Sequence, residues 1–449
     1  MIPLRFAQDT LRQARWQGDW PHSLGEFLID SRAIQPGQVF VALPGSRGDG
    51  HDFIAAARAA GAAGALVARA VDDPLPQCIV PEVLPALQQL AQAWRAQWSG
   101  RLVALTGSNG KTTVKEMLAA ILAPFGPCCV TRGNLNNHIG VPLTLLRLDA
   151  GMRYAVIEMG ANHAGEIALL TRLAAPDVGL VTLAAPAHLE GFGSLEGVAR
   201  AKGEIFSTMG AHAQAVINAD DPFRPLWQSL AGGRYQWLFG AEGDVRAEEV
   251  VLDASGTQCL VKGPNFELTL RLNTAGWHNV QNALAATAAA YALGISPDAI
   301  GQGLRAFRPV EGRLRQTRLS GERLLIDDSY NANPGSVRAA IDVLAQLPSP
   351  RLLCLGDMAE LGDAAATAHA EVGAYALERG IDGLWLVGNL VAEAAKAFGA
   401  QARHFPDRAS LIGAWEAEGE AYRSVLVKGS RSAGMDVVVS AMNKEAAHA

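Results

Sequence analysis

The segment LVALTGSNGKTT, residues 102–113, constrains the fold of this chain more than any other stretch. Its apolar start, residues 102–105, is typical of a buried strand, and Gly107 and Gly110 predict a tight turn in which the backbone can approach a ligand closely. An amphipathic helix follows and ends at Pro124, with one apolar face: Val114, Met117, Leu118, Ile121 and Leu122. The segment therefore predicts a strand, a glycine turn and a helix in immediate succession.

This arrangement is typical of a phosphate-binding loop. Free N–H groups at a helix start attract an anion, Lys111 adds positive charge, and the Thr112 hydroxyl can bind Mg²⁺. The general pattern requires a glycine where this chain has Leu105, so the loop is the shorter G-x-x-G-K-T form. A plain glycine turn is the alternative, but the Lys-Thr-Thr sequence at the helix start favours phosphate binding.

Length and charge limit the possible classes of protein. The chain has 449 residues, enough for two to four domains, and a net charge of -6, which argues against nucleic-acid binding. Its five cysteines lack the C-x-x-C spacing of a zinc site, and the charged N-terminus is unlike a signal peptide. We expect a cytoplasmic monomer with reduced thiols that binds neither nucleic acid nor membrane.

Lysine is scarce, which makes each lysine informative. Only seven of the 38 basic residues are lysines, and three of them, Lys111, Lys202 and Lys428, lie in motifs that contain glycine. Lys202 falls on the apolar stripe of a helix predicted to start at Ser194, where lysine is rarely buried without a partner. The residues alone favour a side chain that reaches out to solvent. The alternative is burial, which lowers the pKa and lets the neutral amine add CO₂ to form a carbamate that binds a second Mg²⁺ beside His188.

Polar residues follow several predicted strands. Glu158 comes directly after the strand over 154–157, and ligands of open parallel sheets bind at the carboxyl ends of strands. A Mg²⁺ ligand is the favoured role for Glu158, and a capped strand end is the alternative. Asn279 and Asn282 begin an Ala-rich helix, where their amides either contact a ligand or cap the helix.

The α/β pattern restarts after a predicted linker over residues 308–313. Strands are predicted at 324–326, 352–355, 384–387 and 425–427, and each ends in glycine or polar residues. These ends indicate one functional edge of a doubly wound sheet.

Seven motifs in order across nearly the whole chain resemble the Mur ligases: TGSNGKTT, EMGANH, AHLEGFGS, ARAKGEIF, HNVQNALAA, DDSYNANP and VKGSR. The resemblance implies an α/β protein of three domains. These are a small N-terminal UDP-sugar-binding domain (1–99), a central P-loop ATPase domain with a parallel sheet (100–310) and a C-terminal Rossmann-like domain (311–449). The last domain is expected to complete the ATP site and to bind D-Ala-D-Ala.

The resemblance also implies a reaction. DSYNANP with VKGSR is similar to the family members that join D-Ala-D-Ala to UDP-MurNAc-tripeptide with ATP, through an acyl phosphate, in peptidoglycan precursor synthesis. The alternatives are another ligase of the superfamily, such as a different Mur step or a folylpolyglutamate synthase, and a nucleotide-binding switch without turnover. Phosphoryl transfer of this kind depends on neutralising charge more than on a protein nucleophile.

The implied site residues are assigned motif by motif. The implied catalytic residues are Lys111, Glu158, His188 and carbamylated Lys202. The implied ligands of two Mg²⁺ ions are Thr112, Glu158, His188 and Lys202. The implied ATP contacts are Gly107, Ser108, Asn109, Gly110, Lys111, Thr112, Thr113, Asn279, Asn282, Arg313 and Asp328. The implied UDP-sugar contacts are Asp30, Ser31, Arg32, Asn134 and Asn137, and the implied dipeptide contacts are Asn331, Asn333, Lys428 and Ser430. Leu183 departs from the Asn that many relatives carry.

Overall fold

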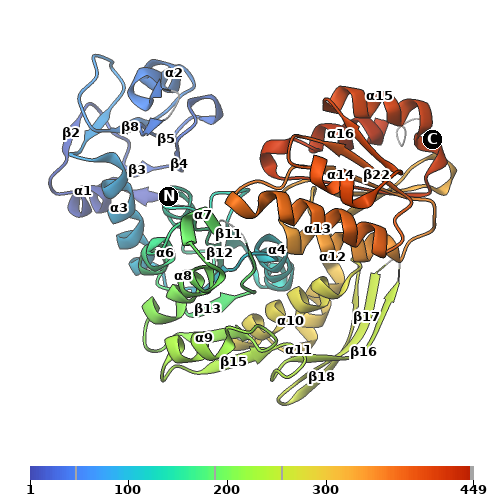
Figure 1. The fold of residues 1–449 in the computed structure, drawn as a ribbon. Coiled ribbons are helices and arrows are strands. Elements are labelled where there is room, and N and C mark those ends of the chain that lie inside the picture. The colour runs from blue at the N-terminus through green and yellow to red at the C-terminus, as the bar shows by residue number, and fades with distance from the viewer. Residues whose placement is uncertain (46–47, 187–188, 254–255, 445–449) are drawn as a thin grey trace.

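The computed structural model describes residues 1–45, 48–186, 189–253 and 256–444. Figure 1 shows an N-terminal part in blue, a central part in teal to yellow and a C-terminal part in orange and red, each built from helices and a sheet. The N-terminal and C-terminal parts stand apart from one another, and both adjoin the central part.

The central part is built on a sheet of six parallel strands. In spatial order they are β11 (Cys128–Val130), β12 (Tyr154–Glu158), β10 (Arg101–Thr106), β13 (Val178–Val181), β14 (Gln214–Asn218) and β15 (Gln236–Phe239). Strand β10 is buried on both faces, with Leu102 and Ala104 in one hydrophobic core and Val103 and Leu105 in another. Such continuous apolar runs are characteristic of parallel sheets covered by helices.

Helices cover both faces of this sheet. One core includes α3 (Val83–Gln97), α5 (Gly140–Leu145), α6 (Glu166–Ala174), α8 (Leu195–Thr208) and α9 (Arg224–Ala231). The other includes α4 (Lys111–Leu122), α10 (Trp277–Ala292) and α11 (Pro297–Ala306). The alanines of α10 are almost fully buried, so this helix is packed within the core. No helix in the described ranges is both long and apolar enough to cross a membrane.

A small antiparallel sheet that the sequence analysis did not predict packs beside α10 and α11 (Figure 1). Its strands are β16 (Arg246–Asp253), β17 (Gly256–Gly263) and β18 (Phe266–Leu272). In β18 the buried residues alternate with partly or fully exposed ones, which is the pattern of a sheet with one face in water.

The N-terminal part contains a five-stranded sheet in the order β2 (Arg15–Gln17), β9 (Gln77–Ile79), β8 (Gly64–Val67), β5 (Val39–Val41) and β4 (Phe27–Leu28). Only the β2–β9 pairing is antiparallel. Helix α3 follows and shares a hydrophobic core with the central part, which ties the two parts together.

The C-terminal part contains a second six-stranded sheet. The order is β19 (Arg315–Arg318), β20 (Leu324–Asp328), β24 (Ser424–Lys428), β21 (Arg351–Gly356), β22 (Gly383–Val387) and β23 (Ala402–Phe405). All pairings are parallel except that of the edge strand β19. The helices α12 (Pro334–Ala345), α13 (Ala365–Glu378) and α14 (Ala392–Phe398) cover one face, and α15 (Arg408–Glu418) and α16 (Asp436–Asn443) cover the other. The strands predicted from the sequence in this part are confirmed.

Candidate active site

The phosphate loop lies between strand β10 and helix α4, as the sequence predicts. Gly107 and Gly110 have positive φ angles of 143° and 82°, a region that residues with a Cβ atom seldom adopt. A Cβ atom on Gly110 would collide with the side chain of Asn282 on α10, and one on Gly107 would collide with Thr182. Both glycines are therefore required by the close approach of neighbouring side chains as well as by the turn.

Lys111 begins helix α4, and its ammonium group folds back onto the loop. Nζ donates a hydrogen bond to the carbonyl oxygen of Gly107 at 2.7 Å. Burial removes water from the ammonium group and lowers the pKa of Lys111, while the carboxylate of Glu158 opposes this shift and Arg313 reinforces it. An anion bound in the loop would supply the counter-charge that this lysine needs.

Glu158 ends strand β12 directly beside β10, and it is 3% exposed. Its Oε2 accepts a hydrogen bond from the Thr112 hydroxyl at 3.1 Å, and its Oε1 accepts one from Asn136 Nδ2 at 2.9 Å. The structure thus brings the predicted Thr112 and Glu158 together. Their oxygen atoms lie side by side next to the phosphate loop and are of the kind that Mg²⁺ prefers.

Three residues that the sequence analysis did not single out hold Glu158 in place. Besides Asn136, the Thr131 hydroxyl accepts a hydrogen bond from the Glu158 backbone at 2.9 Å. Lys115 is 2% exposed, and its Nζ donates to the Thr131 carbonyl oxygen at 3.0 Å. The same ammonium group lies 2.9 Å from Glu116 and 3.9 Å from Glu158. The sequence did contain a signal for Lys115: in a chain with so few lysines, it lies one helical turn after Lys111 of the loop.

Lys202 is buried, with 2% of its surface exposed, so the prediction that its side chain reaches out to solvent is wrong. Its Nζ donates to the carbonyl oxygen of Ala161 at 3.3 Å and lies over the ring of Phe192, 5.3 Å from the centroid. Burial, reinforced by the positive charge of Lys111, lowers the pKa of Lys202 to about 7. Near neutral pH, a large fraction of the molecules therefore carries Lys202 as a neutral amine. His188, its predicted metal partner, lies outside the described residues.

A cavity of about 350 Å³ lies between helix α10 and the C-terminal part, next to the phosphate loop. Both parts line it, and its wall combines apolar surface with amides and charged groups: Asn109, Thr113, Phe239, Trp277, His278, Asn279, Asn282, Arg313, Asp328 and Lys428. Size, apolar wall and a few placed polar groups are typical of a small-molecule site. A nucleotide with its phosphates in the loop would have its nucleoside next to the loop, where this cavity lies. We therefore call it the nucleoside cavity.

Asn279 and Asn282 lie inside helix α10, whose N-cap is Gly276, so the capping alternative is wrong. Asn279 Nδ2 donates to the Thr274 hydroxyl at 2.9 Å and to the Ala275 carbonyl oxygen at 2.8 Å. The amide is thereby fixed in orientation.

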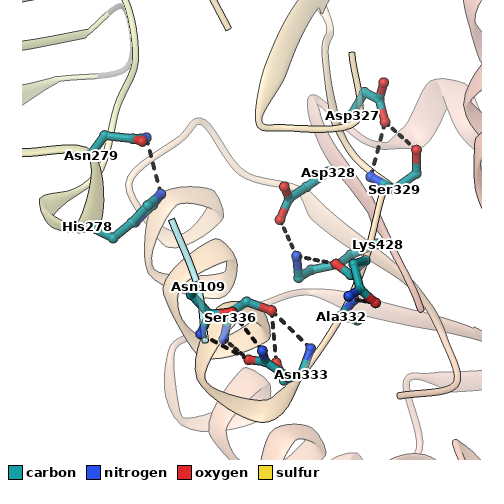
Figure 2. Close-up of polar contacts among 11 residues, drawn as sticks. Asn109, His278, Asn279, Asp327, Asp328, Ser329, Ala332, Asn333, Ser336 and Lys428 are labelled. Carbon is teal, nitrogen blue, oxygen red and sulfur yellow. Dashed lines mark hydrogen bonds and ion pairs between the residues drawn. The ribbon is translucent and has the colours of Figure 1, made fainter. Parts of the chain in front are cut away.

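His278, which the sequence analysis did not assign, also lines the cavity, with its ring nitrogen Nε2 3.1 Å from Asn279 Nδ2 (Figure 2). Burial lowers the pKa of His278 to about 4. The imidazole is therefore neutral and offers hydrogen bonds without charge.

Arg313 of the interdomain segment reaches the phosphate loop. Its guanidinium stacks on the ring of Tyr330 at 4.2 Å and donates to the Thr112 hydroxyl at 3.4 Å. Arg313 Nε is buried and has no hydrogen-bond partner within the part of the chain that the structure describes. Residues from both sides of the linker therefore meet at one site, as predicted.

The predicted dipeptide residues occupy different surroundings. Lys428 forms a buried ion pair with Asp328 (Figure 2). It also donates to the Asn331 carbonyl oxygen at 3.0 Å. The Ser430 hydroxyl lies 3.1 Å from that of Ser432. Asn333 contacts the phosphate loop instead, through Asn109. Lys428 and Asp328 line the cavity of about 350 Å³. Asn331 and Asn333 line a smaller cavity against the phosphate loop instead.

The predicted UDP-sugar residues lie on two loops. Asp30 caps a short 3₁₀ helix (Ser31–Ala33), and its carboxylate pairs with the Arg32 guanidinium at 2.8 and 2.9 Å. These hydrogen bonds lower the pKa of Asp30 to about 2. Asn137 Oδ1 accepts from the backbone of residues 139 and 140 at the start of α5. Its amide nitrogen and the exposed Asn134 remain available to a substrate.

A larger cavity of about 860 Å³ lies between the loop of Asn134 and the C-terminal part. Its wall is polar and carries both signs of charge: Asn134, Glu311, Arg315, Asp327, Ser329, Tyr330, Arg431 and Asp436. Tyr330 also stacks on Arg313, so the larger cavity adjoins the nucleotide site. The two cavities leave room for a nucleotide and for a second, polar substrate.

A phosphate loop completed by a second α/β domain across a linker is typical of a nucleotide-dependent enzyme with a multidomain α/β fold. Three descriptions of one family match successive parts of the chain: "Mur ligase family, catalytic domain" over residues 26–102, "Mur ligase middle domain" over 105–290 and "Mur ligase, glutamate ligase domain" over 312–431. The chain belongs to the Mur ligase family, and the three-domain α/β fold is confirmed.

Relatives of the same kind match over almost the full length. The UDP-N-acetylmuramoyl-tripeptide–D-alanyl-D-alanine ligase of Escherichia coli (strain K12) is 47% identical over 94% of both chains, and that of Haemophilus influenzae is 39% identical over 99% of both. A crystal structure of MurF from Acinetobacter baumannii has a TM-score of 0.92 at 35% identity over 99% of both chains. MurF ligase from Thermotoga maritima in complex with ADP has a TM-score of 0.82 at 29% identity over 94% of this chain and 97% of that one.

Proposed function

We propose that this chain is an ATP-dependent amide ligase that joins D-Ala-D-Ala to UDP-MurNAc-tripeptide and releases ADP and phosphate. Relatives that match almost the full length of the chain are ligases named for this reaction, which supports the proposal. The observation that carries the proposal is the shared phosphate cavity, which the loop from Ser108 to Thr113 lines from one side and Arg313 and Asn331 to Asn333 line from the other. ATP held there is enclosed by both domains.

The chemistry has two steps. The free carboxylate of the tripeptide attacks the γ-phosphorus of ATP, so a carboxylate O–P bond forms, the bond from phosphorus to the ADP oxygen breaks and ADP leaves. The neutral amine of D-Ala-D-Ala then attacks the acyl carbon, a C–N bond forms, the C–O bond to phosphate breaks and the nitrogen loses a proton. Lys111 and Arg313 neutralise the charge on the transferring group, which is the main demand of phosphoryl transfer.

Mg²⁺ fits the donors beside the loop. Among the described residues no group of three or more His, Cys, Asp and Glu side chains is arranged so that it could hold a metal ion. Thr112 and Glu158 nevertheless provide adjacent oxygen donors, and Mg²⁺ usually takes few protein ligands together with phosphates and water. The ion would neutralise charge on the ATP phosphates. We assign Thr112 and Glu158 to the first ion.

We assign Lys202 and His188 to a second Mg²⁺, with Lys202 as its carbamate. A carbamate forms from the neutral amine, and burial of Lys202 lowers its pKa to about 7. Carbamylation would exchange a cation beside Lys111 for an anion, and so remove one source of repulsion. The second site would hold the tripeptide carboxylate.

We place the remaining substrates by domain. Residues 1–99, with Asp30, Ser31 and Arg32, bind the UDP-sugar together with Asn134 and Asn137 of the central domain, residues 100–310. Residues 311–449 complete the ATP site and bind the dipeptide. The polar cavity near Ser430 and Arg431 is large enough for the dipeptide. We further propose that the enzyme acts in the cytoplasm, as a monomer.

The test is phosphate release from ATP with purified protein. We expect release only when UDP-MurNAc-tripeptide and D-Ala-D-Ala are both present, together with the UDP-MurNAc-pentapeptide by mass spectrometry. UDP-MurNAc-tripeptide with single amino acids, and a folate with glutamate, are the comparison reactions. The proposal would be overturned if either comparison pair stimulated phosphate release and the pair of UDP-MurNAc-tripeptide and D-Ala-D-Ala did not.

A further inference from the structure

Two asparagine side chains join the phosphate loop to the C-terminal domain. Asn109 Nδ2 donates to Asn333 Oδ1 at 3.2 Å, and Asn333 Nδ2 donates to Asn109 Oδ1 at 2.6 Å. Figure 2 shows both amides meeting at the start of the helix that carries Ser336. The two residues are 224 positions apart in the sequence, so this contact exists only when the two domains are together.

The orientation of the Asn333 amide is set by its own helix. Asn333 is the N-cap of α12 and forms a capping box with Ser336: its Oδ1 accepts from the Ser336 backbone at 2.9 Å, and its own N–H donates to the Ser336 hydroxyl at 3.0 Å. Because Oδ1 must face the helix backbone, Nδ2 must face away from it. Nδ2 is therefore presented to Asn109.

On the other side, the backbone of Asn109 is held by the central sheet. Asn109 lies between Gly107 and Lys111 in the phosphate loop, and its carbonyl oxygen accepts a hydrogen bond from the Thr182 hydroxyl at 2.6 Å. The amide pair therefore connects the central sheet, through the loop, to the first turn of α12. Helix α12 has 12 residues, and its positive end faces the phosphate cavity that the loop lines.

We propose that Asn333 is a positioning residue that acts through Asn109 and holds the C-terminal domain against the phosphate loop while the acyl phosphate forms. This inference rests on the proposed function and adds a role for a residue otherwise assigned to the dipeptide. Arg313 touches Thr112 only when the two domains are in contact, so a weaker amide pair leaves fewer molecules with a complete site. The consequence is a lower kcat, since a less populated active arrangement lowers the observed rate in proportion.

The experiment separates this role from helix capping. Asn333→Ser keeps a good N-cap residue but is too short to reach Asn109, whereas Asn109→Ala leaves the capping box intact. Each variant is expected to lower kcat about tenfold, and the double variant is expected to be no slower than either single variant, because one contact is lost in all three. Asp407→Ala is the matched control: Asp407 caps α15 in the same domain, and its loss should lower stability and leave kcat unchanged.

Small-angle X-ray scattering with a non-hydrolysable ATP analogue provides a readout without turnover. The wild type should become more compact on binding the analogue, and Asn333→Ser should stay closer to its nucleotide-free radius of gyration. Wild-type kcat in Asn333→Ser, or independent multiplicative effects of the two substitutions, would overturn the inference. If the wild type fails to use D-Ala-D-Ala, the proposed function fails, while the scattering comparison still decides the role of the amide pair.

Discussion

Lys428 and Asp328 lie opposite each other on the neighbouring parallel strands β24 and β20, and their side chains form an ion pair buried between the two domains. Burial lowers the pKa of Lys428, and the negative charge of Asp328 opposes this shift. The ammonium group also donates to the Asn331 carbonyl oxygen. One buried charge pair thus links the nucleoside cavity to the loop that lines the phosphate cavity.

We predict that Asp328→Asn destabilises the C-terminal domain by about 3–5 kcal/mol, because it leaves a buried ammonium group without its counter-charge. The measurement is chemical denaturation followed by the fluorescence of the buried Trp385 and Trp415. Glu418→Gln is the control, since it removes an exposed pair with Arg403 and should cost less than about 1 kcal/mol. Equal costs for the two substitutions would contradict the prediction.

Arg313→Lys is expected to lower kcat/KM for ATP about 10- to 100-fold. Lysine keeps the charge but loses the planar group that stacks on Tyr330 and reaches Thr112. Steady-state kinetics with varied ATP measures the effect. Arg338→Lys changes a similar Arg–Tyr stack on Tyr375 in the same domain, and it should leave the kinetics unchanged. An unaltered kcat/KM in Arg313→Lys would rule out a role for the guanidinium geometry.

Gly110→Ala is expected to abolish ATP binding, as measured by calorimetry with ADP. The new Cβ atom would collide with Asn282, and the positive φ adds about 1–2 kcal/mol of strain. Gly126→Ala separates the two effects: Gly126 also has positive φ, but nothing lies within 4 Å of its added Cβ atom. That variant should bind ADP normally, and normal binding by Gly110→Ala would show that the loop is not the nucleotide site.

The pKa of Lys202 predicts a pH dependence of stability. The folded pKa is about 7, below the ordinary value of 10.5, so between these two values the unfolded chain binds a proton that the folded chain does not. The contribution of Lys202 to stability is therefore fully present above the unfolded pKa and is lost as the pH falls through about 7. Thermal unfolding in CO₂-free buffer should show the wild type gaining more stability from pH 7 to pH 9 than Lys202→Met does. The same gain in both proteins would contradict this.

The proposed carbamate makes a separate prediction. Lys202→Ala should lose nearly all activity, and a short-chain carboxylic acid should restore part of it by supplying an anionic oxygen in the vacated space. Phosphate release with and without the acid measures the rescue. The same acid should not affect the wild type, and full activity in Lys202→Ala would show that no carbamate is needed.

Local sequence patterns determined much of the architecture of this protein. Three features depend only on neighbours a few positions away and can therefore be recognised from the sequence alone. They are the glycines and Lys-Thr of the phosphate loop, the apolar runs of the strands, and the polar residues at the strand ends. Thr112 beside Glu158 also follows from the sequence, because adjacent parallel strands bring their carboxyl ends to one edge.

Only the tertiary structure decided which polar side chains are buried and what they meet. Lys202 lies on a helix stripe that is compatible with either solvent or core, and the packing of Phe192 and Ala161 settled its burial. Lys115, Asn136 and the Asn109–Asn333 pair depend on contacts between segments far apart in the chain. The physical reason is that desolvation and hydrogen-bond partners are properties of the folded surroundings, which no local pattern specifies.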